Sequence, residues 1–229
     1  MNKKLRDAGQ ALIVASALIV PAIGRADAVP LDELSAQWWQ WLLSIPEKDN
    51  PNLDISGDDC MVGQRGSIWF LAGTFGGAAS RTCSIPQGTT LFFPVVNSVQ
   101  VNTPGDCGQD SSVTLDVDTM RMNNAGFING ITIKTVTVDG VAAGSISRVK
   151  SVPFVTALPA KNIFVDFCRK VRPKGQRPGI FSPSVDDGYY AKIDNLSLGS
   201  HMLQITASNG NGFDLSISYV LNVVQVSLK

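Results

Sequence analysis

Four tryptophans are the side chains of this sequence most suited to binding a ligand by stacking. Trp38, Trp39 and Trp41 lie within four positions, and Trp69 follows in an aromatic-rich run. An exposed indole ring presents a flat apolar face beside one polar N–H group, so it can stack on a sugar ring. The alternative is that the first three tryptophans form the buried side of a helix that covers a sheet, and their spacing favours this alternative.

Aspartates are the candidates for hydrolytic chemistry, because only two of the 19 acidic residues are Glu. A glycosidase needs two carboxyl groups about 5–10 Å apart across a cleft. Asp166, Asp186 and Asp187 are the candidates. Asp166 alternates with apolar residues, whereas Asp187-Gly188 is typical of a turn. A hydrolase would require Asp166 and a second carboxyl group to share one pocket, and we expect instead that the protein has no catalytic residues.

A basic stretch at residues 169–179 could bind phosphate or sulfate groups through Arg169, Lys170 and Arg172. The alternative is an ordinary solvated loop whose charge is balanced elsewhere. The whole chain carries 19 basic and 19 acidic residues, which favours the solvated loop. The zero net charge also argues against a nucleic-acid partner.

Calcium is the one metal that the sequence could hold. The polar connector at residues 47–59 offers oxygen ligands from Asp49, Asp54 and Asp58. It lacks the closing Glu of an EF-hand loop, so turns capped by Asp and Asn side chains are the favoured alternative. A Cys/His metal site is not expected, because the chain has no C-x-x-C pair and a single histidine, His201.

The four cysteines, Cys60, Cys83, Cys107 and Cys168, predict two disulfides in an exported chain. Four cysteines allow three connectivities. We favour Cys60–Cys83 with Cys107–Cys168, because each bond would then fasten an irregular segment to an expected strand.

Residues 1–28 have the pattern of a secretory signal peptide. Lys3, Lys4 and Arg6 precede an apolar run at residues 11–23, and residues 26–28 (ADA) provide a small-x-small cleavage site. That apolar run is too short for a comfortable membrane span. We expect cleavage near Ala28, a periplasmic or extracellular location, and no transmembrane span in the mature chain.

The elements that must position these side chains are one helix followed by strands. Apolar residues recur at helical spacing over residues 31–45, between Pro30 and Pro46. About nine or ten short strands with turn signals follow, and they include residues 113–117, 163–168 and a hairpin of residues 202–207 with 214–226. Residues 82–85 and 89–96 flank a tight turn and are expected to pair. Pro94 implies a strand edge or a bulge. The pattern predicts one domain, residues 29–229, folded as an antiparallel β-sandwich of immunoglobulin-like or jelly-roll-like type.

Two stretches resemble known proteins. The WWQW helix, GQRGSIWFLAG (63–73), RTCSIPQG (81–88) and LFFPVVN are similar to a group of uncharacterised exported bacterial proteins, a likeness that implies export but no activity. Residues 186–190 (DDGYY), LSLGSH (196–201) and the last strand resemble the closing hairpin of immunoglobulin-like extracellular domains. This second resemblance implies that His201 lies at a strand start for structural reasons.

Three functions are compatible with these features. The first is an exported, non-catalytic binding or structural protein that recognises a carbohydrate or another polymer of the cell envelope. The second is a secreted hydrolase that uses Asp carboxylates. The third is a self-assembling surface or fibre subunit that associates through strand edges.

Overall fold

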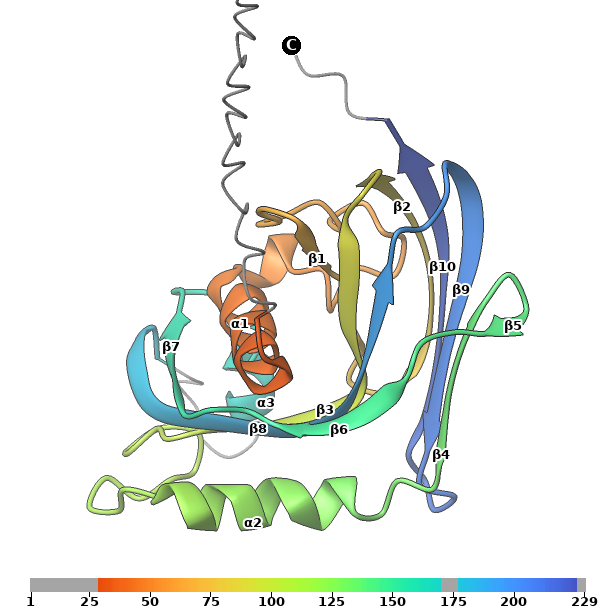
Figure 1. The fold of residues 1–229 in the computed structure, drawn as a ribbon. Helices are drawn as coiled ribbons and strands as arrows, with labels where there is room; N and C mark the ends of the chain where they lie inside the picture. The colour runs from red at the N-terminus through yellow and green to blue at the C-terminus, as the bar shows by residue number, and fades with distance from the viewer. Residues whose placement is uncertain (1–28, 170–176, 226–229) are drawn as a thin grey trace, which may run out of the picture.

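Two five-stranded sheets form the framework of the protein (Figure 1). The computed structural model describes residues 29–169 and 177–225. Sheet A has the order β1 (Ile68–Phe70), β3 (Thr90–Val101), β8 (Gly179–Asp194) and β6 (Ile146–Lys150), with β7 (Phe154–Leu158) paired to another part of β8. Sheet B has the order β2 (Gly77–Pro86), β10 (Asp214–Val224), β9 (Gly199–Ser208), β4 (Ile133–Val138) and β5 (Val141–Ala142). The helical segments are α1 (Leu31–Ser44), η1 (Glu47–Asp49), α2 (Val117–Ile128) and α3 (Val165–Arg169).

Helix α1 lies in the concave face of sheet A, and β8 curves around it (Figure 1). Pro30 is its N-cap residue, and Asp32 and Glu33 occupy the first turn, where carboxylates stabilise a helix. Leu34, Trp38 and Leu42 recur at helical spacing and are almost fully buried. The helix expected at residues 31–45 is therefore confirmed.

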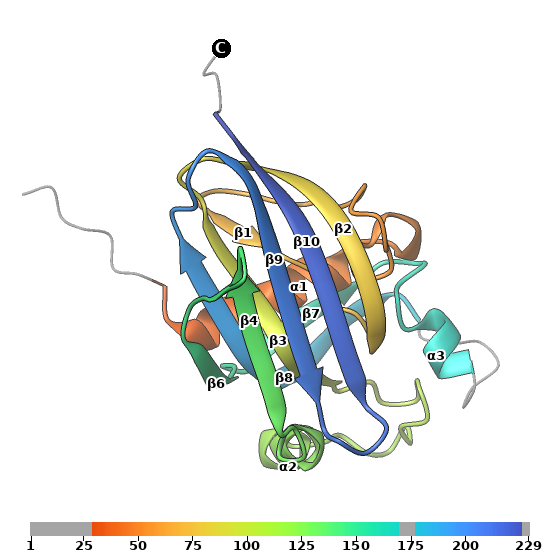
Figure 2. The ribbon, with the colours of Figure 1, turned by 90° about the vertical axis from the view of Figure 1, so that its right-hand side faces the viewer.

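The main hydrophobic core fills the space between the two sheets. Strand β10 contributes Leu215, Ile217, Tyr219, Leu221 and Val223, which alternate with more exposed residues. It pairs with β9 in an antiparallel hairpin, as expected. Figure 2 looks onto sheet B and shows these two long strands side by side.

The β-sandwich with one N-terminal helix is confirmed, but the strands are not all antiparallel. Strand β2 runs parallel to β10, and β1 runs parallel to β3. The turn at residues 87–89 does not close a hairpin either, because β2 belongs to sheet B and β3 to sheet A. Alternating apolar residues show that a strand has a buried face, but not which strand lies beside it.

Two segments expected to be strands are helical or irregular. Residues 113–116 are irregular, and α2 begins at Val117 because the Asp116 side chain caps it by accepting a hydrogen bond from the Thr119 N–H (2.8 Å). The segment expected as a strand at residues 163–168 contains α3. Asp187-Gly188 is not a turn; both residues lie within β8, between β3 and β6.

The disulfides have the connectivity expected from the sequence, Cys60–Cys83 and Cys107–Cys168. The first joins the connector after η1 to β2. The second joins a loop to α3 rather than to a strand. No helix in the part of the chain that the structure describes is long and apolar enough to cross a bilayer. The expected signal peptide, residues 1–28, lies outside that part.

Candidate ligand-binding cavity

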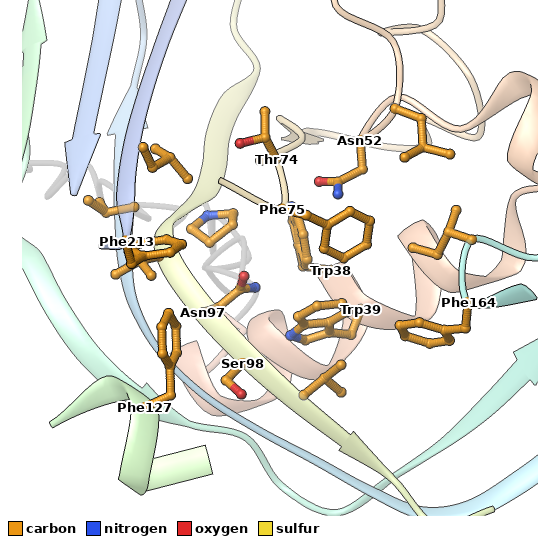
Figure 3. Close-up of a pocket in the computed structure, with 18 of the residues that line it drawn as sticks. Trp38, Trp39, Asn52, Thr74, Phe75, Asn97, Ser98, Phe127, Phe164 and Phe213 are labelled. Carbon is orange, nitrogen blue, oxygen red and sulfur yellow. The ribbon is translucent and has the colours of Figure 1, made fainter. Parts of the chain in front are cut away.

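A cavity of about 710 Å³ lies between α1, strand β3 and the loop that joins β1 to β2 (Figure 3). Its wall contains seven consecutive residues of β3, residues 94–100. Successive side chains of a strand point to opposite faces, so a run of seven lining residues means that the cavity follows an edge of the strand.

Strand β3 has this free edge because its two neighbours differ in length. Strand β8 pairs with β3 over almost its whole length, whereas β1 pairs only with Thr90, Leu91 and Phe92. The register between β3 and β8 shifts between Pro94 and Val96, which confirms the bulge expected from Pro94. No described strand lies beside residues 94–101 on the β1 side, and this gap forms one side of the cavity.

Six aromatic side chains surround the cavity, and they come from five separate segments of the chain. Phe127 and Phe213 meet edge to face, with ring centroids 5.0 Å apart. Phe75 is 60% exposed. The six are Trp38, Trp39, Phe75, Phe127, Phe164 and Phe213.

All four indoles are buried, as the favoured alternative predicted for the first three, so they are not exposed for stacking on a sugar. Trp41 and Trp69 do not line the cavity. Trp38 and Trp39 line it, and their N–H groups donate to protein acceptors, the Leu71 carbonyl (2.9 Å) and the Asp186 carboxyl (2.7 Å). A ligand could therefore contact these two indoles only through the ring surfaces that line the cavity, because both N–H groups are already bonded.

Asn52 is a polar side chain of the cavity wall that makes no side-chain hydrogen bond within the described residues. The residue is 7% exposed, and its amide group has no hydrogen-bond partner among residues 29–169 and 177–225. Its backbone N–H donates to the Asn50 side chain (3.0 Å), which fixes the position of the residue. Buried amide groups are normally paired, so an unpaired amide facing a cavity indicates a place for a ligand.

A chain of hydrogen bonds fixes a second amide, that of Asn97, on the β3 side of the cavity. Its Nδ2 group donates to the Tyr190 hydroxyl (2.9 Å), and this hydroxyl donates to Oδ2 of Asp186 (2.9 Å). Oδ1 of Asp186 accepts the Trp39 N–H. Burial raises the pKa of Asp186 well above its ordinary value and also raises the pKa of Tyr190. The chain thus links α1, β3 and β8 behind the cavity wall.

Of the three aspartates considered for a hydrolase, only Asp166 lines the cavity. Asp166 lines the cavity, but its side chain is 69% exposed and is paired with Arg169 (3.0 Å). Asp186 is fully buried and lies outside the cavity lining. Asp187 is held by two hydrogen bonds from Arg148, at 2.9 and 2.8 Å. The second carboxyl group in the cavity lining is that of Glu47, so neither Asp186 nor Asp187 is the partner of Asp166 that the sequence suggested.

The charged sites expected from the sequence have local partners where they are described. Arg169 pairs with Asp166, whereas Lys170 and Arg172 lie outside the described residues.

In the polar connector, the Asp54 carboxylate accepts three backbone N–H bonds, which is the capped turn preferred for this segment. Asp49 pairs with Lys48 (3.1 Å), and the exposed Asp58 follows the capped turn. Within the described residues no group of three or more His, Cys, Asp or Glu side chains could hold a metal ion.

His201 lies near the start of β9, as the resemblance to immunoglobulin-like domains implies. Its Nδ1 atom is 2.8 Å from the Asp139 carboxylate, and this hydrogen bond raises the pKa of the imidazole. His201 does not line the cavity.

The residues that define the cavity carry only weak signals in the sequence. Asn97 ends an apolar run, and Phe75 is an aromatic residue beside two glycines, an unusual place for a core side chain. Asn52 lies in a segment typical of turns. Nothing local to Phe127 and Phe213, which are 86 positions apart, indicates that their rings meet.

Comparison of the chain with protein-family models, with curated proteins and with solved structures found no match. The function is therefore argued from the cavity and its lining.

Proposed function

We propose that this protein is an exported, non-catalytic binding protein whose cavity takes up a small, mainly apolar molecule. The observation that carries the proposal is the cavity of about 710 Å³ with six aromatic side chains in its wall. Sites for small molecules in proteins have volumes of about 300–1,000 Å³ and apolar walls with a few polar groups. The signal-like segment and the two disulfides support export.

An apolar molecule fits this cavity better than a carbohydrate. A sugar carries hydroxyl groups around its ring, and a buried hydroxyl without a partner costs free energy. Seven of the 21 residues of the described wall are polar or charged, and most of the others are Trp, Phe, Val, Leu and Ile. Two of the polar groups, the hydroxyls of Thr74 and Ser98, are already bonded to Gly76 and Asn124.

Filling the cavity tests the proposal. An added Cβ at Gly73 would lie 3.6 Å from Oδ1 of Asn52 and 3.9 Å from Cγ of Pro94, both cavity residues, so a larger side chain would project into the cavity without a backbone clash. We expect Gly73→Leu to reduce the affinity for N-phenylnaphthylamine, an uncharged probe that fluoresces in apolar sites, by at least about tenfold.

The matched control is Gly126→Leu, because a Cβ at this glycine would meet open space. The full chain is expressed in a bacterial host that exports it and forms disulfides. Circular dichroism establishes that both variants fold. Equal probe affinity of Gly73→Leu and the unaltered protein would show that the probe does not use this cavity, and absence of any probe binding would contradict the proposal itself.

A further inference from the structure

Two side-chain amide groups in the cavity wall offer hydrogen bonds that a purely apolar ligand could not form. The Asn52 amide is more than nine-tenths buried, faces the cavity and lacks a partner among the described residues (Figure 3). The amide atoms are not among the fully enclosed polar atoms without a partner, so they remain open to the cavity and to a ligand that enters it.

Asn97 presents a fixed acceptor to the same cavity. Tyr190 directs its hydroxyl hydrogen to Asp186, so the Tyr190 oxygen accepts from Nδ2 of Asn97. This orients the Asn97 amide, and its Oδ1 atom has no bonding partner in the part of the chain that is described. The two walls therefore offer a donor and an acceptor at Asn52 and an acceptor at Asn97.

The charges of the described lining disfavour an anionic ligand. The charged residues that line the described cavity are Glu47 and Asp166, both acidic, and the described lining contains no Lys, Arg or His. A carboxylate placed in this cavity would lose its hydration without gaining a counter-ion. A cation would also lose its hydration; Asp166 is already paired with Arg169, and Glu47 is only partly buried, so its carboxylate keeps water that a cation would have to displace.

From these observations we infer that the cavity selects an uncharged molecule with an apolar, ring-sized body and a hydroxyl or amide group, which Asn52 and Asn97 hydrogen-bond. This inference rests on the proposed function, because it specifies the ligand class of the same cavity. Fatty acids and other carboxylates are disfavoured as ligands, whereas hydroxylated aromatic or polycyclic molecules fit.

Four competitors that share one ring system test the inference by displacing N-phenylnaphthylamine. They are naphthalene, naphthol, naphthoate and naphthylmethylamine, which present no polar group, a hydroxyl, an anion and a cation. We expect naphthol to compete about threefold to tenfold more strongly than naphthalene, as one net hydrogen bond allows. We expect naphthoate to be the weakest of the four.

Asn52→Leu separates ligand recognition from a merely structural role. Leucine has a similar volume, so the variant should lose the preference for naphthol over naphthalene while its Tm stays close to that of the unaltered protein. A merely structural role for the amide would instead lower Tm and leave the preference unchanged. The matched control is Asn123→Leu on the exposed side of α2, which should change neither the preference nor the probe affinity.

The outcomes distinguish this inference from the proposed function. Stronger competition by naphthoate or by the cationic amine, or equal competition by naphthol and naphthalene, would overturn the inference and leave a binding cavity. Retention of the naphthol preference in Asn52→Leu would overturn the role of Asn52. If N-phenylnaphthylamine does not bind at all, the proposed function is overturned, and the inference with it.

Discussion

Asp186 is a carboxyl-bearing residue in the interior of the protein, behind the cavity wall. Its carboxyl group is fully buried, accepts hydrogen bonds from Trp39 and Tyr190, and has a strongly raised pKa because of desolvation. It connects α1 to β8 and, through Tyr190, to the amide of Asn97 in the cavity. At the scale of single residues, this carboxyl group supports the site without touching the ligand.

The raised pKa of Asp186 predicts a stability that falls as pH rises. Between the ordinary Asp pKa and the raised folded-state value, the folded protein holds a proton that the unfolded chain releases, so higher pH favours unfolding. We expect the free energy of unfolding of the unaltered protein to decrease with pH across this window relative to that of Asp186→Asn. Urea unfolding at a series of pH values measures both, and a pH-independent difference would contradict the assignment.

The loop of residues 72–76 is the element that depends most on a single side chain. Arg81 of β2 is almost fully buried, and its guanidinium group donates to the carbonyls of Ala72 (3.0 Å) and Gly73 (3.0 Å). It also donates to the Tyr219 hydroxyl (2.7 Å), which donates in turn to the Ala72 carbonyl (2.7 Å). One arginine thereby holds the loop that carries Thr74 and Phe75 against sheet B.

Arg81→Lys should weaken both the fold and the cavity. A lysine ammonium group is a compact donor and cannot reach the separated acceptors that the planar guanidinium spans. We expect a loss of about 3 kcal/mol in the free energy of unfolding, because buried acceptors lose their partner. Probe affinity should also fall under conditions in which the variant is still folded. Unchanged unfolding and unchanged probe binding would show that this network does not support the loop.

At the scale of the whole molecule, the two disulfides close loops of different length. Cys60–Cys83 joins residues 23 positions apart, and Cys107–Cys168 joins residues 61 positions apart. In each bond one cysteine, Cys60 or Cys107, lies in an irregular segment. The two bonds therefore restrict the unfolded chain across most of residues 60–168.

Loop length predicts that the second disulfide stabilises the protein more than the first. Closing a loop lowers the entropy of the unfolded chain by an amount that grows with the logarithm of the loop length. Each disulfide is expected to add about 2–5 kcal/mol to the free energy of unfolding, and the longer loop about 1 kcal/mol more than the shorter one. Replacing Cys107 and Cys168 together by Ala should thus lower the free energy of unfolding more than replacing Cys60 and Cys83. Urea unfolding of the two double variants measures the order, and the opposite order would contradict the prediction.

The elements that the sequence determined by itself are those with a strong local pattern. Helix α1 follows from apolar residues at helical spacing between two prolines, and β10 follows from strict alternation over residues 214–224. The favoured disulfide pairing is also correct, although Cys168 lies in α3 and not in the strand on which that preference was based. In α1 and β10 the residues that decide the structure belong to one local pattern.

Tertiary structure alone decided the cavity and the parallel strand pairs, whereas α2 depends on a local cap that the alternation concealed. The Asp116 side chain caps α2 in a stretch whose alternation is typical of a strand, so a local hydrogen bond outweighed the pattern. The amides of Asn52 and Asn97 and the rings of Phe127 and Phe213 come together only because β3 leaves a free edge between α1 and sheet B. A local pattern records which side of an element is buried, but a site assembled from distant segments depends on which elements pack together, and that is set by contacts across the whole chain.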